Sequence, residues 1–92
     1  MVVQTKHQGF GRSALREIQR ISFDDLGAHR FWLDIKKRNT RAQALYVSEG
    51  FVFEGELREA VKVSDGYDSL VVMSMLQSEY ARRRQQATEM PG

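Results

Sequence analysis

A short apolar segment near the middle of the chain constrains the fold most strongly. Residues 29–35 include Phe31, Trp32, Leu33 and Ile35, an aromatic and β-branched run that is consistent with a strand buried on both faces. Segments with helical periodicity lie on either side of this run. The arrangement predicts a mixed α/β layer fold.

The segment before this strand has the spacing of an amphipathic helix. Apolar residues at 10, 14, 18 and 21 fall on one face of a helix from Phe10 to about Ser22. Residues 24–27 then read as a polar turn. After the strand, Asn39 or Thr40 is suited to cap a helix that runs to about Glu49, and Gly50 is suited to end it.

The remaining segments favour strands. Residues 51–63 and 70–76 are mostly extended in pattern, and the Asp65-Gly66 pair between them predicts a hairpin. Val2-Val3 reads as the end of an earlier strand. The predicted order is β-α-β-α-β-β, in which parallel strands joined by helices come first and an antiparallel hairpin finishes the sheet. This places one domain at 1–76 and leaves 77–92 as a polar tail, read as a frayed helix or a disordered segment.

Composition narrows the function classes. A chain of 92 residues with 41% hydrophobic and 28% charged residues fits one small globular domain. Cysteine is absent, and His7 and His29 alone make a weak case for a metal, so no metal site is expected. A net charge of +2 does not indicate nucleic-acid binding. No apolar run approaches the ~20 residues of a membrane span, so a cytoplasmic protein without a membrane role is expected.

Two glycines precede the first predicted helix. Gly9 and Gly11 let the backbone approach a ligand, and the free N–H groups of a helix start favour an anion such as a pyrophosphate. The same residues also fit a dinucleotide-binding fingerprint, with Asp34 as the ribose-binding acid. Against that alternative, residues 5–8 separate the glycines from the preceding strand, and a hairpin ends the chain instead of further βαβ units.

A longer pattern is more specific. The segment from Asn39 to Phe51, with Ala42, Leu45-Tyr46 and Gly50, resembles the second half of the signature of the GCN5-related N-acetyltransferase (GNAT) superfamily. Residues 54–60 and 67–76 resemble the branch of that superfamily that acetylates ribosomal-protein N termini. The first loop is similar to the family's Arg/Gln-x-x-Gly-x-Gly/Ala motif, with Lys6 in the Arg/Gln position and His7 where many members have glycine.

The resemblance implies a role for each matching residue. Coenzyme A would be bound as acetyl-CoA, with Lys6 and Arg12 supplying charge beside its pyrophosphate and Asn39 bonding its pantetheine arm. Tyr46 would be the general acid that protonates the departing thiolate. Two simpler interpretations stay open: Asn39 as a helix cap and Tyr46 as a core aromatic residue. The pyrophosphate would be held by the backbone amides of Gln8, Gly9, Phe10, Gly11 and Arg12.

The implied activity is direct acetyl transfer from acetyl-CoA to an amine, either a protein N terminus or a small amine. A CoA-binding fragment without catalysis and a remnant that binds nothing are the alternatives. A complete domain of this family is longer on its N-terminal side, where the general base often lies, and no acidic residue here matches that position. We therefore expect a homo-oligomer in which a second copy completes the truncated sheet.

Overall fold

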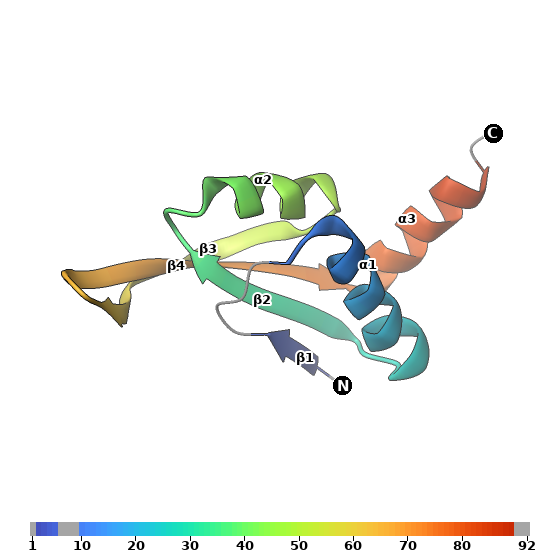
Figure 1. The fold of residues 1–92 in the computed structure, drawn as a ribbon. Coiled ribbons are helices and arrows are strands. Elements are labelled where there is room, and N and C mark those ends of the chain that lie inside the picture. The colour runs from blue at the N-terminus through green and yellow to red at the C-terminus, as the bar shows by residue number, and fades with distance from the viewer. Residues whose placement is uncertain (1, 6–9, 90–92) are drawn as a thin grey trace.

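The computed structural model describes residues 2–5 and 10–89, which form a four-stranded mixed sheet with helices packed on it (Figure 1). The elements in chain order are β1 (Val2–Thr5), α1 (Arg12–Arg20), a π-helical turn η1 (Ile21–Asp25), β2 (Arg30–Lys36), α2 (Thr40–Ser48), β3 (Val52–Val63), β4 (Gly66–Leu76) and α3 (Gln77–Glu89).

The strand order in the sheet is β1-β2-β4-β3. Strands β1 and β2 are parallel, and the helical segment between them supplies the crossover that a parallel pair needs, whereas β4 is antiparallel to both of its neighbours. This confirms the mixed α/β sheet closed by an antiparallel hairpin. The two-residue hairpin loop is Ser64-Asp65, because Val63 pairs with Gly66. Gly66 has a φ of +145°, which suits glycine.

The predicted element order is incomplete at the C-terminal end. Residues 77–89 form the continuous helix α3, which Figure 1 shows leaving the end of β4. The ring of Tyr80 stacks on Phe23 at a centroid distance of 4.8 Å, and the Tyr80 hydroxyl donates to Asp24 at 3.0 Å. These contacts lie 56 or more residues apart in the sequence, so the local polarity of residues 77–89 gave no sign of them.

The polar turn expected at residues 24–27 begins as helix. The chain stays helical through Asp25, and the N–H of Leu26 donates to the carbonyl of Ile21 at 2.9 Å, the i+5 bond of a π turn. This turn places Phe23 in the core, where its side chain is 5% exposed. Burial of that ring explains why helix continues past the first apolar stripe.

One face of the sheet carries the core. Phe31, Leu33 and Ile35 of β2 lie in register with Met75, Met73 and Val71 of β4, and all six are buried. Leu15 of α1 and Tyr46 of α2 pack onto this face. The alternate residue Trp32 is partly exposed. The expectation of a strand buried on both faces therefore holds for the face beneath α1 and α2 and only in part for the other face, where Asp34 is buried and Trp32 is partly exposed.

Both ends of α2 form as the sequence predicts. The side chain of Asn39 accepts a hydrogen bond from the N–H of Ala42 at 3.1 Å, which makes it the N-cap. The helix ends before Gly50, whose φ is +95°. A Cβ on Gly50 would lie 2.6 Å from Cδ of Arg83, so this position requires glycine for its backbone and for the approach of α3.

Candidate functional site

Helix α1 begins with backbone amides that its own carbonyl groups do not engage. Its N-cap is Gly11, at φ −72° and ψ 168°, and no side chain of the described residues caps this end. The first-turn N–H groups have no partner within the helix, and the turn contains no acidic residue. A Cβ on Gly11 would meet no atom within 4 Å. This helix start has the free donors and the positive dipole end that favour an anion.

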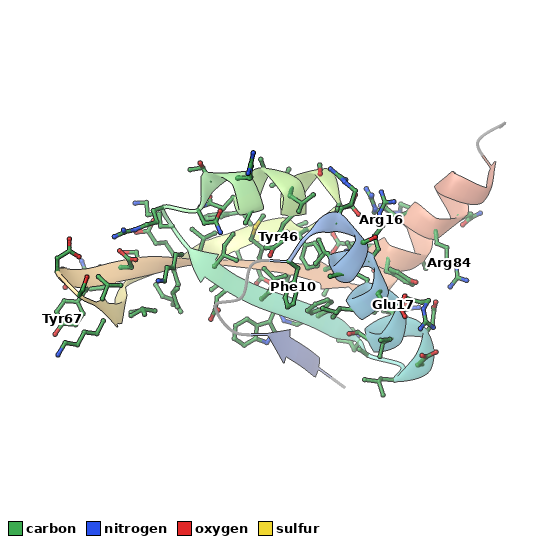
Figure 2. The ribbon with its side chains drawn as sticks, in the orientation of Figure 1. Phe10, Arg16, Glu17, Tyr46, Tyr67 and Arg84 are labelled. Atoms are coloured by element: carbon green, nitrogen blue, oxygen red, sulfur yellow. The ribbon has the colours of Figure 1, made fainter. Side chains whose placement is uncertain are left out.

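Tyr46 connects α2, the signature helix within the Asn39–Phe51 pattern, to the loop that contains Gly9 and Gly11, the glycine loop. Its ring is fully buried in the core, 5.9 Å from the ring of Phe51, and its hydroxyl accepts a hydrogen bond from the N–H of Phe10 at 2.9 Å (Figure 2). Tyr46 is thus a core aromatic residue, as one interpretation held, and it also places a polar atom against the loop. The two motifs, 36 residues apart, meet at this contact.

Asn39 lies two helical turns before Tyr46, about 10 Å along the axis. The cap occupies its side-chain oxygen and leaves its amide NH2 group as a donor. The residue is exposed. The cap interpretation is confirmed, and it is compatible with a ligand contact through the NH2 group.

The side chain of Arg12 contacts the C-terminal end of α2. Its Nη1 lies 2.6 Å from Oε2 of Glu49 and 3.5 Å from the hydroxyl of Ser48. Lys6, Gln8 and Gly9, the other residues expected in the loop, lie outside the described residues.

Glu49 was not predicted from the sequence to belong to the site. Its carboxylate is 2% exposed and is paired with Arg12, with Arg16 at 2.6 Å and with Arg83 at 3.7 Å. The hydrogen bond from Arg16 lowers the pKa of Glu49 and outweighs the opposing effect of burial. The four-residue spacing of Arg12 and Arg16 signals a shared helix face, but nothing local pairs that face with Glu49.

The dinucleotide alternative is not supported. Asp34 lies inside β2, opposite Val72 of β4, and is 5% exposed, so it does not sit at the end of a strand where a ribose would bind. In the described part of the sheet β1 and β2 are the one parallel pair.

Other chemistry finds little support among the described residues. They contain no group of three His, Cys, Asp or Glu side chains placed to hold a metal. His29 is exposed. None of the described helices has the length and apolar content to cross a membrane. Glu54 is engaged by Ser74 and Arg30, which lower the pKa of its carboxyl and make it a weak base.

Comparisons with known proteins agree with this geometry. Residues 3–51 match the model of the acetyltransferase (GNAT) family, which includes the glycine loop and the signature helix. The chain belongs to the GNAT acetyltransferase family.

A curated relative is a spermidine acetyltransferase. The chain is 33% identical over 85 residues to spermidine N(1)-acetyltransferase of Vibrio cholerae serotype O1, a match that covers 90% of this chain and 49% of the relative. The chain therefore spans about half the length of the curated relative it matches. These matches give no support to the ribosomal-protein branch that the sequence suggested.

Solved structures agree. The crystal structure of spermidine/spermine N-acetyltransferase SpeG from Vibrio cholerae in complex with manganese ions superposes with a TM-score of 0.76 at 34% identity, over 83% of this chain and 45% of that one. A dodecameric structure of the Vibrio cholerae enzyme superposes equally well, at 34% identity over 83% of this chain and 44% of that one. The sheet and helices of this chain thus correspond to part of a longer GNAT domain.

Proposed function

We propose that the chain binds acetyl-CoA and takes part in acetyl transfer to a small amine. The observation that carries the proposal is the hydrogen bond from Phe10 to Tyr46, which joins the open start of α1 to the signature helix. A pyrophosphate at the first-turn amides of α1 would place the rest of the cofactor close to that contact. Asn39 would bond the pantetheine arm through its NH2 group.

The proposed chemistry is direct transfer in a ternary complex. The amine nitrogen attacks the acetyl carbonyl carbon, the carbon–sulfur bond breaks, and the nitrogen passes a proton to solvent water. The departing CoA thiolate accepts a proton from the Tyr46 hydroxyl, the general-acid role that a tyrosine can fill. The spermidine acetyltransferases among its relatives favour a polyamine-like acceptor over a protein N terminus.

Calorimetric titration with acetyl-CoA tests the binding step. We expect saturable binding that Gly11→Glu weakens by about tenfold to a hundredfold, because the new carboxylate would repel the phosphates at the helix start. The variant should fold, since Gly11 has an ordinary φ and open space at its Cβ.

Gly55→Glu is the matched control. Gly55 has open space at its Cβ and lies on β3, at the opposite edge of the sheet from β1. The Gly55→Glu variant carries the same added charge far from the loop, so its affinity for acetyl-CoA should match that of the unmodified chain. Absence of acetyl-CoA binding by the folded chain would refute the proposal. Binding without acetylation of spermidine would identify a CoA-binding module without catalysis.

We further propose that the chain forms a homo-oligomer. In the described part of the sheet β1 is an edge strand of four residues paired with β2 alone, and an open edge favours pairing with another chain. The dodecameric relative is consistent with association. Light scattering at micromolar concentration should give a mass above 10.6 kDa. A folded, monodisperse monomer would contradict this proposal.

A further inference from the structure

Three guanidinium groups from two helices meet on one buried carboxylate. Arg12 and Arg16 project from the first two turns of α1, and Arg83 reaches across from α3. Glu49 follows the end of α2 and receives all three. Figure 2 places Arg16 on the part of α1 that lies toward α3. We call Arg12, Arg16 and Arg83 the arginine cluster.

The arginine cluster carries more charge than its partner neutralises. Three guanidinium groups against one carboxylate leave a local charge of +2. Glu49 is 2% exposed, whereas the three arginine side chains are 45–61% exposed, so the surface presented to solvent is positive. Glu49 is the one carboxylate in the described part of the chain that pairs with these arginines. A further anion from solution would relieve the repulsion among them.

The guanidinium groups also have donors to spare. A guanidinium has five N–H donors in a planar fork. Arg12 uses Nη1 for Glu49 and Ser48, and Arg16 uses Nε and Nη2 for Glu49. The remaining N–H groups suit an oxyanion with several acceptor oxygens. A phosphate monoester has three such oxygens and carries nearly two negative charges at neutral pH, which matches the excess charge.

We propose that the arginine cluster binds the ribose 3′-phosphate of coenzyme A. The inference rests on the proposed binding of acetyl-CoA. Arg12 is the first residue of α1, where the pyrophosphate is proposed, and Arg16 follows one turn later, about 6 Å along the axis. In coenzyme A a single ribose separates the 3′-phosphate from the pyrophosphate, so two phosphate sites this close match the ligand.

The proposal gives α3 a role in ligand binding. Arg83 lies outside both the glycine loop and the signature helix, and its Cδ would lie 2.6 Å from a Cβ on Gly50. The lack of a side chain at Gly50 leaves room for the side chain of Arg83 beside Glu49. Stacking of Tyr80 on Phe23 and the ion pair between Arg84 and Asp24 hold α3 in place.

Titration with coenzyme A and with 3′-dephospho-coenzyme A at about 50 mM salt tests the inference, since the second ligand keeps the pyrophosphate and lacks the 3′-phosphate. We expect the chain to prefer coenzyme A by about tenfold. Arg16→Gln and Arg83→Gln should each reduce that preference to about threefold or less, with dephospho-coenzyme A affinity nearly unchanged. The preference should shrink as salt is added.

Arg82→Gln is the matched control, because Arg82 is an exposed neighbour of Arg83 on the same helix. It should keep the full preference, and circular dichroism melts should show every variant folded. Equal affinity for the two ligands would overturn the inference and leave acetyl-CoA binding intact. The inference would also be overturned if Arg16→Gln and Arg83→Gln lost affinity for both ligands equally, or if neither variant altered the preference for coenzyme A. Failure to bind either ligand would refute the proposed function itself.

Discussion

Tyr46→Phe is expected to lower the rate of acetyl transfer to spermidine by about 10²–10⁴-fold, the usual contribution of a positioned general acid. Phenylalanine keeps the ring that fills the core between α2 and the sheet and removes the proton donor. The dissociation constant for acetyl-CoA should change by less than about threefold, because the hydroxyl is proposed to act on the leaving thiolate. Steady-state release of free thiol measures the rate, and calorimetry measures the binding.

Removing this hydroxyl also has an effect that does not depend on turnover. The N–H of Phe10 loses the acceptor that lies 2.9 Å away, and a partly buried donor left without a partner costs about 1–2 kcal/mol. Urea unfolding should report that loss. Tyr67→Phe is the control, since Tyr67 is 61% exposed at the start of β4, and it should alter neither quantity. An unchanged turnover number in Tyr46→Phe would remove Tyr46 from the proton-donor role.

Local patterns predicted the parts of the fold that local chemistry determines. The side chain of Asn39 caps the start of α2, and Gly50 takes the positive φ that ends that helix. The apolar stripe of α1 and the strand containing Phe31 follow from side-chain periodicity alone. The signature from Asn39 to Phe51 likewise spans one helix and its two ends, so its residues were visible together in the sequence.

Contacts between distant segments account for what the sequence did not predict. Glu49 meets Arg12 and Arg16 across 37 and 33 residues, and no periodicity marks a single glutamate at a helix end as a buried charge. Helix α3 has a polar sequence and is held by Tyr80 and Arg84 against η1, so its docking depends on a π turn that reads locally as a polar loop.

The ribosomal-protein branch that the sequence suggested finds no support in the comparisons. The residues that carried the resemblance to that branch, 54–60 and 67–76, lie on β3 and β4, and members of a family with different acceptors can share such strands. The sequence around Asn39 and Tyr46 therefore identified the family and could not identify the acceptor. Acceptor choice depends on groups that touch the amine, whereas the roles that the resemblance implies for the signature residues concern the cofactor.

Glu49→Gln is expected to destabilise the fold by about 2 kcal/mol at pH 7, more than Arg16→Gln does. The glutamine loses charge-assisted hydrogen bonds worth about 1.5–3 kcal/mol and leaves three cations close together. Arg16→Gln leaves Glu49 paired with Arg12 and Arg83, so no buried charge is stranded. Urea unfolding of both variants measures the difference, and a smaller effect in Glu49→Gln than in Arg16→Gln would contradict it.

Lowering the pH tests whether the charge of Glu49 or its packing accounts for its contribution to the free energy of unfolding. The pKa of Glu49 is lowered in the folded chain from an ordinary value of 4.5, so its contribution is fully present above that value. The contribution is lost as pH falls through the lower, folded pKa. Glu17 and Glu54 also have lowered pKa values and destabilise both proteins alike on acidification. The stability gap between the unmodified chain and Glu49→Gln should therefore narrow below about pH 4.5, whereas a gap independent of pH would assign the loss to packing.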